Sequence, residues 1–365
     1  AADPGPKLRD VMREGGLVFL VPIVVLIGVL IAGFTPTYAA SAGILASIGA
    51  SWLTKTHRMG LEQIFDALEL GARNMVMTAV LLCAVGLIVN VIATTGLGPM
   101  FSLMISEWAG GNLMIALVLI ALASLVLGMG LPVTAAYIVL GTLSAPALYH
   151  MILEAQLIEM LVNGTVAQEV KMFFVMGAPQ SAGLLDGAMS KIDALALVQT
   201  LPPELLMLIN DQAFSPAALT AALLSVHMII FWLSQDSNVT PPVCLAAFSA
   251  AAVATADPMK TGFTAWRIAK DLYVIAVLMA YTPLMSGDLA AMFEVTLFAL
   301  FGLWALTTAL EGYAKGPIGW PFRAVFLALG VGLLCPLGAV VHTGLTVVLI
   351  AANQLSGRLE LAKAT

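Results

Sequence analysis

Long apolar runs separated by short polar connections restrict the fold of this chain more than any other feature of its sequence. Nine such stretches approach or exceed the length of about 20 residues that a membrane-spanning helix needs. Apolar residues make up 61% of the chain and charged residues only 10%, against about 45–50% and 25% in soluble domains. The sequence therefore predicts an all-α polytopic membrane protein. The candidate spans are residues 17–33, 38–53, 75–95, 112–127, 131–148, 223–256, 272–286, 293–310 and 322–350, the last of which contains Pro336.

The charge balance and the lack of catalytic signatures exclude several classes of function. The formal net charge is −6, whereas a nucleic-acid-binding protein needs a basic face. The sequence contains no His-Glu-x-x-His, no Gly-x-Ser-x-Gly and no glycine-rich phosphate loop. Its three cysteines are far apart and have neither disulfide-framework nor zinc-site spacing. We therefore expect neither an enzyme nor a cofactor, so any transport would be driven by a coupled ion.

The distribution of Lys and Arg indicates how the chain crosses the bilayer. We place its beginning inside and treat 112–127 and 135–148 as the arms of a re-entrant hairpin that enters and leaves on the outside. Residues 223–256 then cross once, as a broken helix. This threading puts eleven basic residues inside and only Lys171 and Lys191 outside, in agreement with the positive-inside rule. Two complete spans in place of the hairpin would move the basic cluster that begins at residue 260 outside, so we disfavour them.

Four segments are expected along the chain. They are 1–148 with transmembrane helices and the hairpin, 149–222 as an extramembrane helical insertion, 223–290 with the broken helix, an amphipathic arm and a span, and 291–365 as a C-terminal transmembrane extension. The insertion carries seven acidic residues against two lysines, and its apolar spacing predicts short amphipathic helices on the outer side. Two roles stay open for it: a passive loop subdomain, or a surface on which a partner docks.

Two of the apolar stretches are interrupted by residues that break helices. The first interruption reads GMGLPVT over residues 128–134, and the second reads DSNVTPP over 236–242. Glycine and proline let a backbone turn with unpaired carbonyl groups, which membrane depth tolerates only inside protein or beside a wet cavity. Although one such break is more often a structural kink, two in one membrane domain point to the substrate and ion site of a transporter.

The chemistry of these breaks favours two kinds of ligand. Freed carbonyls and threonine hydroxyls are hard oxygen donors that suit a small alkali cation. Half-helices that begin near Val133 and Val243 would direct their N-terminal dipoles at an anionic substrate group. The candidate substrate and ion site comprises Gly128, Met129, Gly130, Pro132, Thr134, Asp236, Ser237, Asn238, Thr240, Pro241 and Pro242.

Few ionisable residues lie inside the apolar stretches. Asp236 is the carboxylate that we expect to serve the second break, as a cation ligand or a cap of backbone amides. His227 precedes that break by less than three turns, and we favour a packed or interfacial histidine over a proton relay. Glu294 and Glu311 fall near the ends of a predicted span.

Longer motifs around the two breaks carry a family resemblance. GMGLPVTAAYIVL at 128–140, followed by APAL at 145–148, resembles a signature of the large membrane subunit of TRAP (tripartite ATP-independent periplasmic) transporters. NVTPPVCLAAF at 238–248, running on to DPMKTGFTAW at 257–266, resembles another. REGGL at 13–17 and LEGY at 310–313 look like the fused-permease branch that works with TAXI-type binding proteins. The resemblance covers nearly the whole chain except 149–222.

The resemblance implies an elevator-type secondary transporter of a bacterial inner membrane. In that family a periplasmic binding protein delivers an organic anion, and sodium drives its uptake. The two breaks would be a hairpin tip and a neighbouring unwound helix, and their oxygens would converge on one Na⁺. Two loops more than about 15 Å apart could not share such an ion. The expected Na⁺ ligands are Gly128, Gly130, Thr134, Asn238 and Thr240.

Two departures from the family pattern shape the expected partners. The family's first inverted half and its small four-helix membrane subunit or domain have no counterpart in these 365 residues, and 149–222 stands where the family has a short connection. We therefore expect the C-terminal half of a permease, with the remaining half, the small subunit and a periplasmic binding protein as partners. The alternative is a channel-like or scaffolding membrane subunit. Whether sodium or protons provide the coupling, and which organic acid is carried, stay open.

Overall fold

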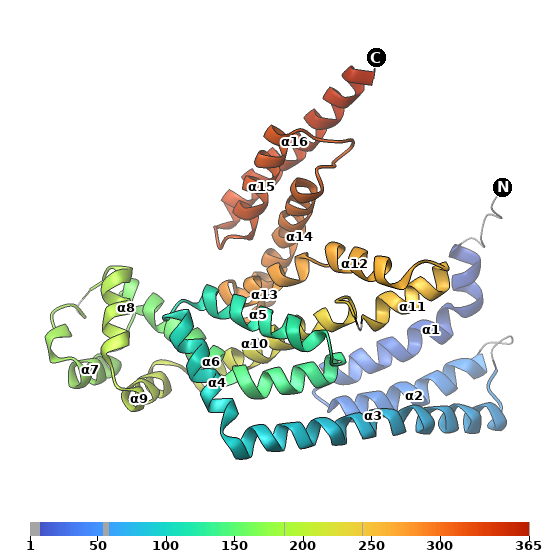
Figure 1. Ribbon diagram of the computed structural model, residues 1–365, viewed down its shortest axis with the longest axis horizontal. Coiled ribbons are helices and arrows are strands. Elements are labelled where there is room, and N and C mark those ends of the chain that lie inside the picture. Colours follow the sequence, from blue (N-terminus) through green and yellow to red (C-terminus); the bar gives the residue numbers. More distant parts are fainter. Residues whose placement is uncertain (1–7, 54–57, 186, 243, 365) are drawn as a thin grey trace. The chain divides into compact units, whose positions relative to one another are not determined.

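A computed structural model describes the chain except for residues 1–7, 54–57, 186, 243 and 365 (Figure 1). Its described part is built of α-helices and short 3-10 helices, with no β-strand. Five described segments are long and apolar enough to cross a membrane, which confirms the expected all-α polytopic fold. They are Leu61–Thr95 (α3), Val133–Val162 (α6), Pro216–Asn238 (α10 with η2), Leu289–Glu311 (α14) and Ala339–Ser356 within α16.

The chain divides into two compact units, residues 1–83 and 84–365. In the first unit, α1 (Leu8–Ile31) packs against α2 (Pro36–Leu53). A Cβ atom at Gly43 of α2 would lie 3.7 Å from Leu26, so the small residue permits a close helix pair. These helices correspond to the expected spans 17–33 and 38–53, whereas α3 begins 14 residues before the expected start at 75.

The second unit contains the end of α3 and all later elements. The first of these elements are α4 (Leu97–Ala109), α5 (Leu113–Gly128), α6, α7 (Gln168–Gly177), η1 (Pro179–Ser181), α8 (Lys191–Thr200) and α9 (Pro203–Ala213). They are followed by α10 (Pro216–Ser234), η2 (Gln235–Asn238), α11 (Leu245–Ala254), α12 (Pro258–Ile268), α13 (Asp271–Tyr281), η3 (Pro283–Met285), α14, α15 (Trp320–Leu334) and α16 (Ala339–Ala364).

Residues 96–111, which the threading treats as an outside loop, are mostly helical. Gly96 and Gly110 flank α4 with φ angles of +71° and +56°, a conformation that glycine adopts without steric penalty. The next helix, α5, begins because the Asn112 side chain accepts hydrogen bonds from the amides of Met114 and Ile115. At 16 residues α5 is about 24 Å long, shorter than the roughly 30 Å hydrocarbon core of a bilayer.

The hairpin arm expected at 135–148 does not end at residue 148. Helix α6 continues to Val162 and is therefore long enough to cross a membrane by itself. Pro146 lies inside α6 without ending it. More than half of the most apolar window of α6 is buried, a larger share than in the other four candidate spans. The interior of this unit is therefore arranged around α6.

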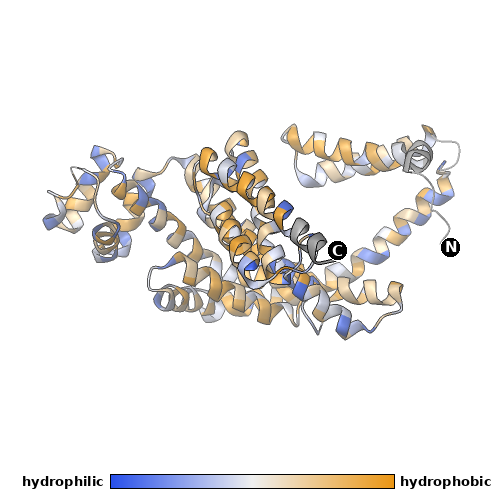
Figure 2. Ribbon diagram, turned by 90° about the horizontal axis from the view of Figure 1, so that it is seen from above, coloured by the Kyte–Doolittle hydropathy of each residue, from blue (hydrophilic) through white to orange (hydrophobic). Residues whose placement is uncertain are grey.

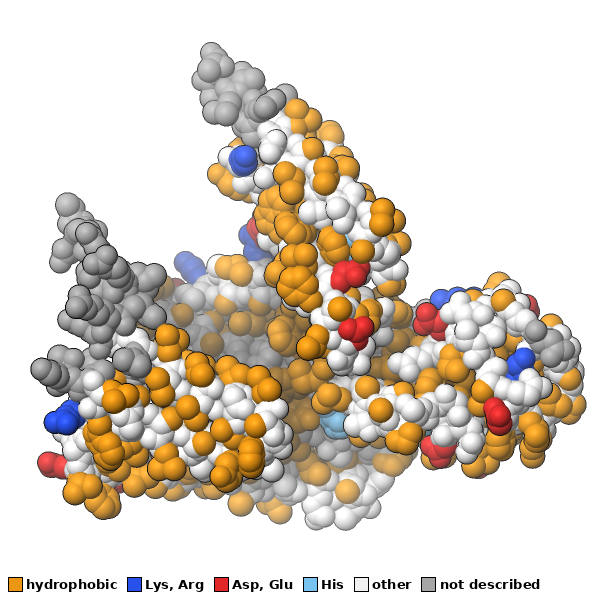
Figure 3. Space-filling model, turned by 180° about the vertical axis from the view of Figure 1, so that it is seen from behind, with side chains coloured by type: hydrophobic (Ala, Val, Ile, Leu, Met, Phe, Trp, Pro, Cys, Tyr) orange, Lys and Arg blue, Asp and Glu red, His pale blue; other side chains and the backbone are white. Residues whose placement is uncertain are grey.

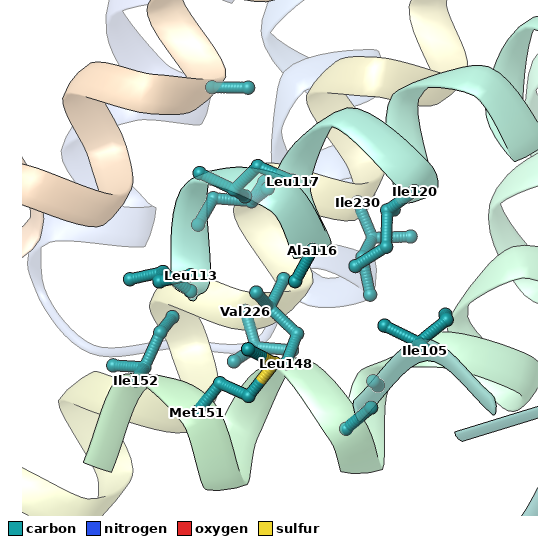
Figure 4. Packing of buried hydrophobic residues seen from close by; sticks show 14 of the residues in the cluster. Ile105, Leu113, Ala116, Leu117, Ile120, Leu148, Met151, Ile152, Val226 and Ile230 are labelled. Atoms are coloured by element: carbon teal, nitrogen blue, oxygen red, sulfur yellow. The ribbon is translucent and has the colours of Figure 1, made fainter. Parts of the chain in front are cut away.

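Helix α6 joins two separate hydrophobic cores. Its residues from Leu140 to Leu153 contribute to a core shared with α4, α5, α10 and α13 (Figure 4). Leu157, Ile158 and Leu161 belong instead to a second core, formed with α7, α8 and α9. The insertion expected at 149–222 thus has its own core, but its packing begins near residue 157 and ends before α10. Figure 2 shows that hydrophilic residues are frequent on this subdomain.

The apolar run at 322–350 forms two helices instead of one span. The chain leaves α15 at Leu334 and enters α16 at Ala339, so Pro336 lies in the connection between them. Helices α14, α15 and α16 pack together around a third core that includes Ala305, Phe326 and Leu349. Arg323 donates to the carbonyls of Ala309 and Leu310, both at 2.7 Å, and thereby caps the C-terminal end of α14.

The close contact of α14 with α15 depends on small residues. A Cβ atom at Gly330 would lie 3.0 Å from the backbone nitrogen of Leu306, and no side-chain rotation relieves that contact. We therefore expect Gly330→Ala to lower the free energy of unfolding by about 1–3 kcal/mol, the usual effect of overpacking. Thermal unfolding of the purified protein in detergent measures this.

Gly344→Ala is the matched control, since a Cβ atom there meets nothing within 4 Å. Alanine at this helical position should leave stability unchanged or raise it by up to about 1 kcal/mol. Equal unfolding temperatures for the two variants would contradict the packing of α14 on α15.

Candidate functional site

The first break separates α5 from α6 and leaves backbone carbonyls free. Helix α5 ends at Gly128, and α6 begins at Val133. Pro132 occupies the position whose amide would bond to the Gly128 carbonyl in a continuous helix, and proline has no N–H group. In the described part of the chain, no hydrogen bond outside the helices reaches the carbonyl oxygens of Gly128, Met129 or Gly130.

In the second break, prolines again remove the amide donors of backbone carbonyls. Helix α10 tightens into η2, and the amides of Val239 and Thr240 both donate to the Asp236 carbonyl, at 3.0 and 2.9 Å. Pro241 and Pro242 stand four residues after Ser237 and Asn238, so neither of those carbonyls has a helical donor. The chain becomes helical again at Leu245. Val243, near which the second half-helix is expected to begin, lies outside the described residues.

The two breaks lie against each other. A Cβ atom at Gly128 would stand 3.2 Å from both the Cα and the backbone nitrogen of Ser237. Both residues are buried, and η2 also contacts α6. Glycine is therefore required at position 128 because the two backbones meet there. Segments separated by more than 100 residues form one structural unit.

A group of buried side-chain oxygens lies next to this meeting point. Asp236 and Thr240 are 1% and 4% exposed, and the Asp236 carboxyl is near the hydroxyls of Thr240 and Tyr273. Within the described residues, Asp236 Oδ2, Thr240 Oγ1 and Tyr273 Oη are buried without a hydrogen bond of good geometry. Because buried polar groups are normally paired, these three oxygens form a site suited to a ligand that interacts with oxygen atoms.

The other predicted site residues differ in exposure. Ser237 is buried, and its hydroxyl donates to the Ser234 carbonyl at 3.0 Å. Asn238 is half-buried and donates to Gln235 Oε1 at 3.2 Å. The exposed members are Met129, Gly130, Thr134 and Pro242, while Pro132 and Pro241 are half-buried. The first break therefore has one face against η2 and another that is open.

Two residues of the site were not found from the sequence. Tyr273 belongs to α13, and only the packing of α13 on α10 brings its hydroxyl near Asp236. Ser124 lies one helical turn before Gly128, is fully buried, and its Oγ has no hydrogen-bond partner among the described residues. Ser124 could have been found from its spacing, because residues i and i+4 share one face of a helix and Ser124 stands four residues before Gly128.

The remaining ionisable residues make ordinary contacts. His227 Nδ1 lies 3.1 Å from the Tyr137 hydroxyl, the kind of contact that a packed histidine makes. Glu311 pairs with Arg267 at 2.7 Å and with Lys270, so the end of α14 lies beside α12. That contact agrees with the threading, which places the C-terminal end of α14 and the basic residues of α12 on the same side of the membrane. Glu294 is half-buried in α14 and lines a pocket away from the two breaks.

Comparison with known proteins identifies the family. A family model described as "Tripartite ATP-independent periplasmic transporter, DctM component" matches residues 3–285, well over half of the chain. Neither the curated proteins nor the solved structures gave a match. The family resemblance of the motifs is thus confirmed, whereas the TAXI-type branch and the C-terminal half stay predictions. The chain belongs to the DctM family, the membrane component of tripartite ATP-independent periplasmic transporters.

Proposed function

We propose that this TRAP transporter component carries out sodium-coupled import of organic acids and that the two helix breaks hold the coupling ion. The observation that carries the proposal is the backbone contact between Gly128 and Ser237. On both sides of this contact, prolines remove the amides that would otherwise occupy the carbonyl oxygens. A bound cation would satisfy such carbonyls in place of the missing amides.

The composition of the site favours an alkali cation. Carbonyl, hydroxyl and carboxylate oxygens are hard ligands that replace the hydration shell of a small cation. Asp236 adds one negative charge to a cluster that includes the Thr240 and Tyr273 hydroxyls, so a bound Na⁺ would offset the desolvation of this carboxylate. In this proposal the Gly130, Thr134 and Asn238 oxygens complete the ion site together with Gly128 and Thr240.

The open face of the first break suits the substrate. Helices α6 and α11 both begin directly after a break, and the first amides of a helix have no partners within it. Such amides favour the carboxylate of an organic acid. Met129 and Gly130, just before α6, and Thr134 in its first turn are exposed, so a substrate could reach them.

The remaining parts of the proposal concern assembly and location. Membership of the family implies a periplasmic binding protein and a small membrane component as partners. We place the complete permease in a bacterial inner membrane, with the insertion on the periplasmic side. The binding-protein gene that lies beside the gene of this chain would identify the type of binding protein, TAXI or another.

Proteoliposomes that contain the complete permease test the proposed sodium-coupled import. They are supplied with the binding protein and a labelled organic acid, and uptake of the acid is measured. We expect uptake to require an inward sodium gradient. Uptake driven equally well by a proton gradient without sodium would contradict the coupling ion, and no uptake of any acid would favour a scaffolding subunit.

Two threonine substitutions test the ion site. Thr134→Val and Thr240→Val keep the side-chain volume but remove a hydroxyl, and we expect each to raise the half-saturating sodium concentration of uptake. About a 10- to 150-fold increase is expected at the buried Thr240, since a lost contact to a charged group costs about 1.5–3 kcal/mol.

Thr142→Val is the matched control for both threonines. Thr142 lies in α6, and its hydroxyl already donates to the Ile138 carbonyl at 2.8 Å. An unchanged sodium dependence in all three variants would remove the threonines from the site.

A pair of glycines tests whether the breaks must touch. Gly128→Ala forces Ser237 away by a few tenths of an ångström, whereas a Cβ atom at Gly130 meets nothing within 4 Å. We expect Gly128→Ala to reduce sodium-driven uptake severely and Gly130→Ala to retain most of it, at matched amounts of folded permease measured by size-exclusion chromatography. Equal uptake by both variants would show that contact between the breaks is not required.

We also propose the insertion as the docking surface for the binding protein. Met172 and Met176, one turn apart on α7, are 65% and 68% exposed although this subdomain has its own core. Exposed methionines on an extramembrane surface are typical of adaptable interaction sites. We expect the double variant Met172→Ser and Met176→Ser to raise the binding-protein concentration needed for half-maximal uptake.

Met259→Ser is the control for docking. Met259 is 42% exposed on α12, which the threading puts on the opposite side of the membrane. An unchanged dependence on binding-protein concentration in the α7 double variant would leave the insertion as a passive subdomain.

A further inference from the structure

A pocket of about 340 Å³ lies away from the two breaks, among the C-terminal helices. Its walls come from the end of α13 with η3, the first turns of α14, and the connection between α15 and α16. Most of these residues follow residue 285, where the family match ends. Most of the pocket therefore lies outside the part of the chain that the family model matches.

His342 presents an unpartnered nitrogen in this pocket. The side chain is 6% exposed, and its Nε2 lies 3.0 Å from the Cys335 carbonyl oxygen. A carbonyl oxygen only accepts hydrogen bonds, so Nε2 carries a proton. In the neutral imidazole Nδ1 is then an acceptor, and it is buried without a hydrogen-bond partner among the described residues. Phe298 packs against the ring, with centroids 4.8 Å apart, and fixes its position.

Glu294 gives the pocket a negative charge. It lies one helical turn before Phe298, on the same side of α14, and lines the pocket together with His342. Neither lysine nor arginine lines it. The described part of the chain has no ion pair within 4.0 Å between Glu294 and His342, and no group of three residues suited to a metal.

We propose that this pocket binds a primary ammonium group. Glu294 supplies the countercharge, and His342 Nδ1 accepts one of the N–H hydrogens. The ammonium carries three donors, so both unshared acceptors can be satisfied by one small cation. The volume fits a small headgroup or a short amine, near the lower end of the range for ligand pockets, about 300–1,000 Å³.

The position of the pocket indicates where such an amine comes from. It lies where α13 and α15 end and α14 and α16 begin. With α14 across a bilayer, this end of the helices would lie near the depth of the lipid headgroups. Hydrophobic side chains are frequent on the surface of α14–α16 (Figure 3). Phe293 and Val341, which lie close to pocket residues in the sequence, are 70% and 49% exposed. Two sources carry the required primary ammonium group: the headgroup of phosphatidylethanolamine, and free ethanolamine.

The test measures thermal unfolding of the full chain in nanodiscs. One arm compares phosphatidylglycerol alone with phosphatidylglycerol plus phosphatidylethanolamine, and a second adds free ethanolamine to phosphatidylglycerol nanodiscs. A ligand that binds only the folded state raises the unfolding temperature with its concentration. Stabilisation in the first arm alone assigns the lipid headgroup, and stabilisation in both assigns the ammonium group itself.

Glu294→Gln and His342→Phe separate this site from general lipid effects. We expect each to lower the apparent affinity for the ammonium ligand by at least about tenfold, since a hydrogen bond to a charged group contributes about 1.5–3 kcal/mol. Glu107→Gln removes a carboxylate from α4 and should change nothing.

Three results would overturn the proposal. They are no stabilisation in either arm, equal stabilisation of wild type and Glu294→Gln, and equal stabilisation by phosphatidylcholine, whose quaternary ammonium has no N–H group. None of these measurements involves sodium or uptake, so the inference stands or falls separately from the proposed transport function.

Discussion

A backbone carbonyl inside a membrane protein needs a hydrogen-bond donor or a cation, and the arrangement of the two breaks follows from this requirement. Continuous helices satisfy their carbonyls internally. Pro132 removes the donor for Gly128, while Pro241 and Pro242 remove those for Ser237 and Asn238. Exposure of such carbonyls to lipid would be costly, so the chain buries them where α5, α6 and η2 meet. In the proposed function, the same burial would give the site its affinity for a cation.

Small residues make that burial possible. Gly128 allows η2 to approach the end of α5, and Gly330 allows α15 to approach α14. In both places a backbone atom would stand within 3.2 Å of an added Cβ atom, so side-chain rearrangement alone would not make room for a methyl group. Close packing in this chain therefore depends on a few positions without a Cβ atom, as is usual between membrane helices.

The breaks could be predicted because glycine and proline act locally, whereas several other features could not. The threading treated 96–111 as a loop, since α4 is too short to cross a membrane and glycines flank it. Glu154 and Glu159 made 149 a plausible boundary, but α6 continues because Met151 to Leu153 still pack in the main core. Tyr273 joins Asp236 only through tertiary contact between α10 and α13, which no spacing within one segment reveals.

A structure of the complete permease would show whether the two breaks share one sodium ion. Structures would be determined by electron cryomicroscopy in sodium and in choline buffers. We predict density in sodium, coordinated by the carbonyl oxygens of Gly128 and Asn238 and by Thr240, that is lost in choline. Sodium-dependent density elsewhere, with these carbonyls paired to protein donors, would contradict this prediction.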